Sequence, residues 1–320
     1  MEDEILIITN ENDLHADFLI EKFKERDLPF FRFNTERLNE SNLSYRLGDI
    51  EHFSLTQYGI HKLKDWQFRS VWYRRPEKPK HTIFNDVISQ KFVEIESKSA
   101  LESIVRNIEA KIWVNHPTAL YACHSKLLQL VDAQKFGLLI PNTLVTNEPL
   151  ELQKFYKEFN QKIVYKPIRD YPLMSESGKG IFTSQIRPQD MRNLESLKHC
   201  PILVQEEISK KYDIRVTVVG NIVFSAIIHS QMHKKTKVDW RKGDVTQIQH
   251  EIITLPETVE EKCKMLTTSY GLNFSAIDLI QDIEGNFVFL ELNRNGQWAW
   301  LEHLTGARIS DAFINLLKGD

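Results

Sequence analysis

Residues 274–300 read FSAIDLIQDIEGNFVFLELNRNGQWAW, and the rest of the predicted architecture is built around them. Two apolar runs with a period of two flank the polar segment 282–286, whose residues favour turns. This pattern predicts a β-hairpin in which Asp282 pairs with Phe287.

The same register places three oxygen-bearing side chains on one face of the hairpin. Asp278 lies directly opposite Glu291, with Cβ atoms about 5 Å apart. Asn293 lies on the same face as Glu291, one strand period away. Two neighbouring carboxylates repel each other unless a cation is present, and Mg²⁺ takes oxygen ligands from one or two carboxylates plus substrate phosphates. The spacing therefore predicts a magnesium site, and the alternative is a solvated hairpin face that carries ordinary acids.

The composition indicates a soluble globular protein of two or three domains. The chain has 320 residues, of which 42% are hydrophobic and 27% charged. A formal net charge of -3 argues against a nucleic-acid partner, since such binders are usually basic. The three cysteines show no disulfide framework or metal-ligand spacing, which is typical of a reducing compartment. No signal peptide or apolar run of about 18 residues is present, so we expect a cytoplasmic protein without a membrane partner.

The first part of the chain, residues 1–118, predicts a small α/β domain with a parallel sheet. Residues 5–9 form an apolar run typical of a buried strand, helical spacing follows over 14–23, and 30–33 is again strand-like. We expect further strands over 44–58 and 68–73 and a long amphipathic helix over 86–110.

Two arginines, Arg74 and Arg75, end the apolar strand in the string Val71-Trp72-Tyr73-Arg74-Arg75-Pro76. They are either the solvated end of a strand or an exposed rim that faces an anionic ligand. The sequence alone does not separate these two interpretations.

The middle of the chain, residues 119–204, predicts a second lobe with two isolated lysines. Ser125 can cap a helix that runs to about residue 136, which places Lys126 in its first turn. A cation is unfavourable there unless an anion lies nearby, although a solvated lysine is the simpler interpretation. Lys166 interrupts an apolar strand over 163–166. The glycine-rich segment 175–180 is either a phosphate-binding loop or a plain flexible turn.

The last part, residues 205–320, predicts a third lobe built on strands. Gly220-Asn221 between two β-branched runs indicates a hairpin in which Val219 pairs with Ile222 and Arg215 with Ala226. Asp213 then shares a face with Arg215, either as a simple ion pair or as part of a site. The basic loop over 233–243 is either solvated or a lid over a polyanion, and residues 309–317 predict a closing amphipathic helix.

Seven short motifs occur in an order that resembles the ATP-grasp superfamily. They are Lys126, Tyr165-Lys166-Pro167, Gln205-Glu206-x-Ile208, Asp213-Ile214-Arg215, Asp239-Trp240-Arg241, Ser275-Ala276-Ile277-Asp278 and Leu290-Glu291-Leu292-Asn293.

Within that superfamily the chain resembles the graspetide (microviridin-type) maturases of ribosomal peptides. The strings Val71–Pro76 and Glu291–Trp298 carry this likeness, which covers nearly the whole chain. The ribosomal-protein glutamate ligases are more distant relatives that share three of the motifs. One departure is Arg294, where the maturases commonly have proline, and no role is assigned to it.

The resemblance implies an ATP-grasp fold of two lobes, preceded by an α/β pre-ATP-grasp domain, and it implies a role for each motif residue. Lys126 and Lys166 would contact ATP phosphates, and Arg215 and Arg241 would face the γ-phosphate and an acyl-phosphate. Mg²⁺ would be held by Asp278, Glu291 and Asn293. The adenine would meet the strand of Gln205, Glu206, Glu207 and Ile208, and the ribose would meet Asp213.

The activity that the resemblance implies is ATP-dependent macrocyclisation of a precursor peptide with a leader and an acidic, Thr-rich core. Asp or Glu side chains would be activated as acyl-phosphates and joined to Thr or Ser hydroxyls, or to Lys amines. Arg74 and Arg75 would suit the acidic core, and a homodimer is compatible with this family. Two alternatives stay open, an ATP-grasp ligase that adds amino acids to a protein or small molecule, and a nucleotide-binding regulator without turnover.

Overall fold

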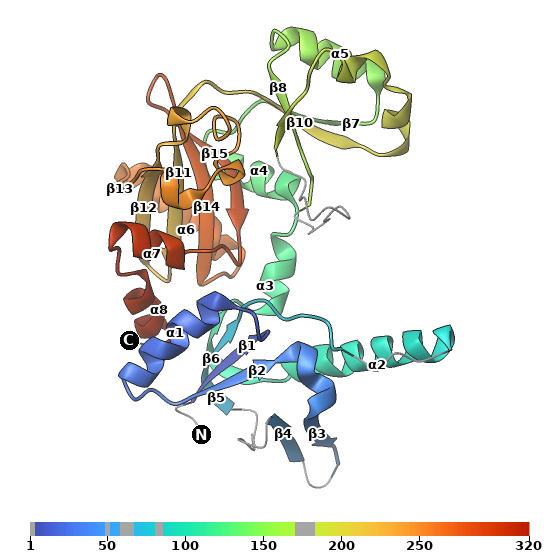
Figure 1. The fold of residues 1–320 in the computed structure, drawn as a ribbon, viewed down its shortest axis with the longest axis vertical. Coiled ribbons are helices and arrows are strands. Elements are labelled where there is room, and N and C mark those ends of the chain that lie inside the picture. Colours follow the sequence, from blue (N-terminus) through green and yellow to red (C-terminus); the bar gives the residue numbers. More distant parts are fainter. Residues whose placement is uncertain (1–3, 49–51, 58–66, 81–85, 170–182, 320) are drawn as a thin grey trace. The chain divides into compact units, whose positions relative to one another are not determined.

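The structure is a computed structural model that describes residues 4–48, 52–57, 67–80, 86–169 and 183–319. The chain forms two compact units (Figure 1). The first comprises Met1–Ala119, Leu272–Phe274 and Arg308–Asp320, and the second comprises Leu120–Gly271 and Ser275–Ala307. These units differ from the predicted domains 1–118, 119–204 and 205–320, because the C-terminal helix packs with the first unit. The division of the second unit into two lobes stays a prediction.

The first unit contains a parallel sheet with the strand order β2-β1-β5-β6. Its predicted first strand and helix are confirmed, and the buried residues of β1 have an exposure of 2% or less. A separate hairpin, β3–β4, covers much of the predicted strand region 44–58. The elements are β1 (Ile5–Thr9), α1 (Leu14–Glu25), β2 (Phe30–Asn34), β3 (Ser41–Arg46), β4 (His52–Gln57), β5 (Gln67–Tyr73), α2 (Val87–Arg106) and β6 (Glu109–Val114).

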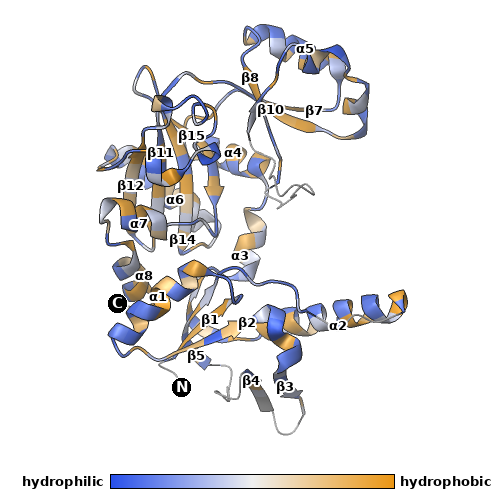
Figure 2. Ribbon diagram, viewed as in Figure 1, coloured by the Kyte–Doolittle hydropathy of each residue, from blue (hydrophilic) through white to orange (hydrophobic). Residues whose placement is uncertain are grey.

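The predicted helix over 86–110 is too long, because it ends at Arg106 and β6 follows. The string Glu109-Ala110-Lys111-Ile112-Trp113-Val114 alternates with a period of two, and its pairing with β5 turns that weak pattern into a strand. The first half of the expected apolar stripe is exposed, with Phe92 at 63% and Ile95 at 61%. Figure 2 shows hydrophobic and hydrophilic residues side by side along α2.

The predicted C-terminal helix is confirmed as α8 (Ile309–Lys318), and it packs in the first unit. The ring of Phe313 lies 5.7 Å from that of Trp72 and 5.0 Å from that of Phe274, measured between centroids. The end of the chain therefore completes the core of the domain in which it begins.

The second unit contains two mainly antiparallel sheets, with the strand orders β7-β10-β8-β9 and β13-β12-β11-β14-β15. Helix α5 packs with the first sheet through a core that includes Leu152, Ile163 and Val204. The elements are α3 (Pro117–Ala122), α4 (Lys126–Lys135), β7 (Thr143–Thr146), α5 (Pro149–Glu158), β8 (Ile163–Lys166), β9 (Ser184–Gln185), β10 (Ile202–Glu206), β11 (Lys210–Val219), β12 (Ile222–Ile228), β13 (His250–Ile253), α6 (Glu257–Ser269), β14 (Phe274–Asp282), β15 (Phe287–Asn293) and α7 (Ala299–Thr305).

Both predicted hairpins are found, and the predicted pairing holds at Arg215 and at Asp278. In β11–β12, Val219 pairs with Ile222 and Arg215 with Ala226. In β14–β15, Asp278 pairs with Glu291 as predicted, whereas the turn pairs Gln281, not Asp282, with Phe287. A β-bulge between Asp278 and Leu279 absorbs this one-residue difference.

Candidate functional site

The centre of the candidate site is the carboxylate pair on β14 and β15. Asp278 and Glu291 are cross-strand partners, and their exposures are only 7% and 4%. The Asn293 amide Nδ2 donates to Asp278 Oδ2 at 3.2 Å. The hairpin therefore brings together the three residues that the sequence predicted as metal ligands.

Three cations, drawn from three different elements, engage this pair. Arg215 of β11 lies 2.8 Å from Asp278 Oδ1 through its Nη1 atom. Lys126, in the first turn of α4 as predicted, places Nζ 2.9 Å from Glu291 Oε2. Arg241 Nη1 lies 2.9 Å from Glu291 Oε1. The arginine and lysine residues expected to face phosphates thus meet at the predicted metal ligands.

The two carboxylates differ in their proton affinity. Burial raises the pKa of Asp278 to about 6, with the Glu291 carboxylate adding to this effect and Arg215 opposing it. Burial also acts to raise the pKa of Glu291, but Arg241 and Lys126 outweigh it and hold that pKa well below its usual range. Glu291 is therefore the permanent anion of the site, and Asp278 is the member of the pair that gains a proton first.

Lys166, at the end of β8, is the second predicted phosphate lysine and is also buried. Burial lowers its pKa to about 8, opposed by the nearby Glu291 carboxylate and reinforced by Lys126 and Arg241. Five cationic side chains and four carboxylates gather here, and Glu206, Glu207 and Lys237 line the adjoining cavity. The cations are Lys126, Lys166, Lys210, Arg215 and Arg241, and the acids are Asp213, Asp239, Asp278 and Glu291.

Arg241 owes its position to Asp239, a residue to which the sequence gave no role. The carboxylate accepts from Arg241 Nε at 2.9 Å and from Nη2 at 3.0 Å, and it also accepts from the Arg241 backbone N–H. This two-point contact fixes the plane of the guanidinium. Arg241 remains 38% exposed, so it is the cation of the cluster that a substrate can reach from solvent. The Asp-x-Arg spacing was the signal that could have identified the pair.

Asp213, predicted to hold the ribose, is engaged within the protein by two neighbours. Lys210 Nζ lies 2.8 Å from its carboxylate and also donates to the Val238 carbonyl at 3.3 Å. The Ser230 hydroxyl donates to the same carboxylate. Lys210 and Ser230 were not predicted, because neither stands in a motif and their partners are set by tertiary contacts.

A small cavity joins the predicted adenine strand to the cation cluster. The Gln205 side-chain oxygen is buried and accepts no hydrogen bond from any residue that the structure describes. The free volume of the cavity is about 60 Å³, so a purine enters only if the lining side chains rearrange. Its lining includes Val164, Lys166, Thr183, Gln205, Glu206, Glu207, Ile208, Lys210, Lys237, Val238 and Leu290.

The donor chemistry fits a hard divalent cation that also binds a nucleotide. Asp278, Glu291 and Asn293 offer carboxylate and amide oxygens, and Mg²⁺ uses such oxygens together with substrate phosphates. Within the described residues there is no group of three or more His, Cys, Asp or Glu side chains suited to a metal. The described residues therefore contain no site in which protein side chains alone surround a metal. A site shared with substrate phosphates uses one or two carboxylates, and Asp278 and Glu291 provide two.

Two features predicted from the sequence, Arg74 and the glycine-rich segment 175–180, are not part of the described site. Arg74 is 1% exposed, contrary to the expectation of a rim, because its Nε atom is 3.3 Å from the buried Asp13 Oδ2 in the first unit. Its neighbour Arg75 is exposed. The glycine-rich segment 175–180 lies outside the described residues.

Arg294, to which the sequence assigned no role, contacts the main chain of α3. Its Nη1 atom donates to the Leu120 carbonyl at 2.7 Å. This bond ties the chain that leaves β15 to the end of α3.

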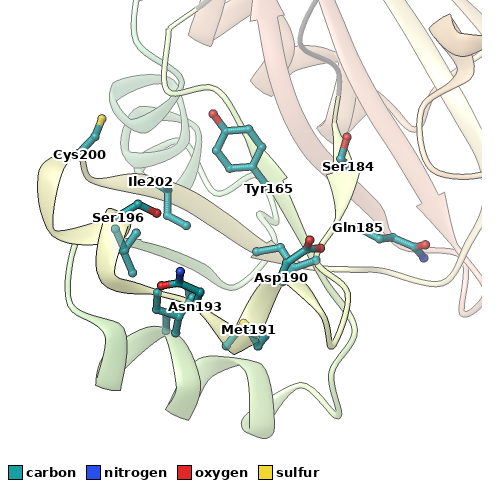
Figure 3. A pocket seen from close by; sticks show the side chains of 13 residues that line it. Tyr165, Ser184, Gln185, Asp190, Met191, Asn193, Ser196, Cys200 and Ile202 are labelled. Atoms are coloured by element: carbon teal, nitrogen blue, oxygen red, sulfur yellow. The ribbon is translucent and has the colours of Figure 1, made fainter.

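A second and larger cavity lies on the opposite face of the β7-β10-β8-β9 sheet. Residues alternate along β8, so Lys166 faces the small cavity beside Gln205 and Tyr165 faces this one. Its volume is about 440 Å³. Figure 3 shows Tyr165 and Ile202 on the strands, with Asp190, Met191 and Asn193 on the facing segment. Leu152, Ile186, Leu194 and Leu197 complete an apolar lining with polar groups at its edge.

Comparisons with known proteins agree with this geometry. Residues 4–120 match the MvdD pre-ATP grasp domain, and residues 123–317 match the RimK-like ATP-grasp domain. No helix among the described residues is long and apolar enough to cross a membrane.

Two solved structures resemble nearly the whole chain. A Chryseobacterium gregarium RiPP-associated ATP-grasp ligase, in complex with ADP and a leader and core peptide, is 29% identical with a TM-score of 0.90. The alignment covers 98% of this chain and 96% of that one. The macrocyclase MdnC from Microcystis aeruginosa MRC, bound with its precursor peptide MdnA, is 29% identical with a TM-score of 0.85, and 98% of each chain is covered.

A curated relative is the mouse (Mus musculus) N-acetylaspartylglutamate synthase A, which is 22% identical over 88% of this chain and 73% of its own length. The predicted fold class and the resemblance to graspetide maturases are confirmed. With the matched domain spanning residues 123–317, the chain belongs to the RimK-like ATP-grasp family of ligases, which use ATP with Mg²⁺, and it carries a pre-ATP-grasp domain of the MvdD type.

Proposed function

We propose that this protein is an ATP-dependent macrocyclase of a ribosomally made precursor peptide. It joins Asp or Glu side chains of the peptide to Thr or Ser hydroxyls, or to Lys amines. The observation that carries the proposal is the cluster of Lys126, Arg215 and Arg241 around Asp278 and Glu291. The whole-chain likeness to a ligase bound to ADP, leader and core peptide supports it.

The chemistry requires charge neutralisation and positioning more than covalent help from the protein. A peptide carboxylate oxygen attacks the γ-phosphorus of ATP, and the bond between this phosphorus and the β,γ-bridging oxygen breaks. ADP departs, and the peptide side chain becomes an acyl-phosphate. A hydroxyl or amine then attacks the acyl carbon, loses its proton, and releases phosphate. The net change is one side-chain ester or amide bond, formed with the formal loss of one water from the peptide, for each ATP converted to ADP and phosphate.

Each predicted residue has a place in this scheme. Lys126 and Lys166 contact the ATP phosphates, to which their ammonium groups are attracted. The chain over 205–208 borders the adenine, where the unpaired Gln205 oxygen can accept a hydrogen bond from an amino group. Asp213 meets the ribose once it exchanges a contact with Lys210 or Ser230 for one with a sugar hydroxyl.

The carboxylates and arginines exchange partners when the substrates bind. Asp278, Glu291 and Asn293 would hold Mg²⁺, which would supply positive charge beside the phosphoryl group. Arg215 and Arg241, released from the carboxylates, face the γ-phosphate and then the acyl-phosphate. The 38% exposure of Arg241 suits this role, because an incoming peptide carboxylate can reach it.

The apolar cavity behind the sheet is the proposed docking site for the leader of the precursor. Its volume of about 440 Å³ lies within the range of small-ligand and anchor-residue sites. Docking on the face opposite the nucleotide would hold the leader while leaving the reactive face to the core. The edge that carries Asp190 and Asn193 would suit a basic or hydrogen-bonding residue beside an apolar anchor.

The test is to incubate the purified protein with ATP, Mg²⁺ and the acidic short peptide encoded nearest to its gene. We expect the intact mass of the peptide to fall by about 18 Da, the mass of one water, for each bond, with one ADP formed in step. Alkaline hydrolysis of the product then separates esters from amides. An unchanged peptide mass, with or without ADP, would contradict macrocyclisation of that peptide.

The rival ligase activity predicts another outcome of the same assay. The curated relatives include an N-acetylaspartylglutamate synthase A and the alpha-aminoadipate–LysW ligase LysX. A mass gain equal to an amino-acid residue, when free amino acids are supplied, would favour this rival. ATP binding without ADP release for any peptide or amino acid would favour the regulator.

Docking in the apolar cavity predicts a selective defect in peptide binding. Met191→Glu places a charge against the lining, and we expect peptide affinity to fall by about tenfold or more. ADP affinity should not change, because the small cavity beside Gln205, proposed for the nucleotide, is on the other face of the sheet. The exposed neighbour substitution Gln189→Glu is the matched control. Calorimetry with the unmodified peptide and with ADP measures both values, and equal peptide affinities for the two variants would exclude this docking site.

A further inference from the structure

Gln129 of α4 is a buried amide whose hydrogen bonds all go to main-chain atoms. Its exposure is 2%. Its Nε2 atom donates to the Leu292 carbonyl at 3.0 Å and to the Cys123 carbonyl at 2.7 Å, and its Oε1 atom accepts from the Leu292 N–H at 2.8 Å. The side chain therefore pairs with Leu292 in the way that a neighbouring β-strand would.

Leu292 is the residue between Glu291 and Asn293, on the edge strand of its sheet. The order β13-β12-β11-β14-β15 leaves one side of β15 without a strand partner in the described sheet. Elsewhere on that side, the Phe289 N–H donates to the Leu139 carbonyl at 2.7 Å. Gln129 provides the corresponding support at Leu292, and fixing this peptide unit fixes the two flanking side chains that project to the opposite face.

Helix α4 supplies both a cation, Lys126, and a backbone-binding amide, Gln129. Residues three apart lie on one face of a helix, so Lys126 and Gln129 face β15 together. The lysine contact with Glu291, at 2.9 Å, runs through a flexible side chain and does not set the backbone. The side-chain amide of Gln129 fixes the backbone of β15, because it binds both the N–H and the carbonyl of Leu292.

We propose that Gln129 is a positioning residue for the Mg²⁺ ligands Glu291 and Asn293. It acts by holding the Leu292 main chain against α4. Both ligand side chains then keep their orientation when Lys126 and Arg241 exchange their contacts with Glu291 for contacts with phosphate. The inference rests on the proposed function, in which these residues hold the metal. Groups that orient metal ligands typically contribute about 10- to 100-fold in metal affinity.

The test compares ADP binding in Mg²⁺ with ADP binding in EDTA, by calorimetry. In the wild-type protein we expect Mg²⁺ to strengthen ADP binding. In Gln129→Met, which keeps the volume and removes the hydrogen bonds, we expect this strengthening to fall by about tenfold or more. ADP affinity in EDTA should stay within about twofold of wild type, because Lys126 and Lys166 are unchanged. Gln134, exposed on the same helix, gives the matched control Gln134→Met.

The outcomes are distinguishable from a general loss of structure. Gln129→Glu keeps the shape and the acceptor but sets a carboxylate against two carbonyls, so it provides a second measurement where the methionine variant does not fold. A parallel fall of ADP affinity in Mg²⁺ and in EDTA, or an equal defect in Gln134→Met, would overturn the positioning role. Equal ADP affinities of the wild-type protein in Mg²⁺ and in EDTA would instead refute the metal assignment of the proposed function.

Discussion

Glu291→Gln is expected to remove the Mg²⁺ dependence of ADP binding, with a loss of more than about 100-fold in Mg²⁺-supported affinity. Glutamine keeps the shape of the side chain but removes the negative charge that Glu291 offers to the metal. Peptide-dependent ADP formation should fall with it, by about 10²- to 10³-fold. The measurement is ADP titration at several Mg²⁺ concentrations, together with a turnover assay.

The same substitution also has a predictable effect on stability. Glu291 balances Lys126, whose side chain is 6% exposed, and Arg241. Removing a charged partner from a buried pair typically costs about 3–5 kcal/mol in the free energy of unfolding. The solvent-exposed Arg241 contact contributes less than the lysine contact. Urea unfolding of Glu291→Gln should therefore show a clear loss, and added anions such as pyrophosphate should restore part of it.

Glu284→Gln, in the exposed turn of the same hairpin, is the matched control. It removes an equal charge, and we expect ADP binding, turnover and stability close to wild type. Retention of Mg²⁺-dependent binding in Glu291→Gln would contradict the assignment of the metal ligands. An identical effect of both substitutions would show that net charge, and not the contact, is responsible.

Arg74→Met is expected to destabilise the first unit by about 3–5 kcal/mol, because it leaves the buried Asp13 carboxylate without its cation. The two side chains are 1% and 3% exposed and lie 3.3 Å apart. Burial acts to raise the pKa of Asp13, but Arg74 and the Thr9 hydroxyl outweigh it, so that this pKa is lowered in the folded protein. Stability from this pair is present above the unfolded pKa of the acid and is lost as pH falls through the lower folded value.

Controls separate this structural role from the substrate role expected from the sequence. Arg75→Met removes the exposed neighbour and should change the free energy of unfolding by less than about 0.5 kcal/mol. The double variant Asp13→Asn/Arg74→Met should recover part of the loss, since no unpaired charge remains buried. Urea unfolding measures all three variants. If Arg74→Met were as stable as wild type and failed to bind peptide, its role would be that of a substrate-binding residue after all.

Much of the fold and the centre of the site follow from local sequence patterns. Alternation with a period of two and short turns set the pairing of Asp278 with Glu291 and of Arg215 with Ala226, because strand register depends on neighbouring residues. The bulge after Asp278 shows the limit of this reasoning. The predicted turn register was off by one residue, and the bulge absorbs this shift, so that Asp278 still pairs with Glu291.

The contacts between distant segments could not be predicted in the same way. No local pattern predicts that Lys126 contacts Glu291, that Arg241 contacts Glu291, or that Arg74 is buried. The strand over 109–114 was missed for the same reason, since only its pairing with β5 distinguishes it from the end of a helix.

Motif composition and strand periodicity are local properties of the chain, so the candidate site residues and their strands could be inferred from the sequence. The tertiary structure was needed to show which charges are in contact, which are buried, and that Gln129 binds the Leu292 main chain. These depend on how elements far apart in the sequence pack, and burial, more than residue type, then sets the pKa of Asp278 and Lys166.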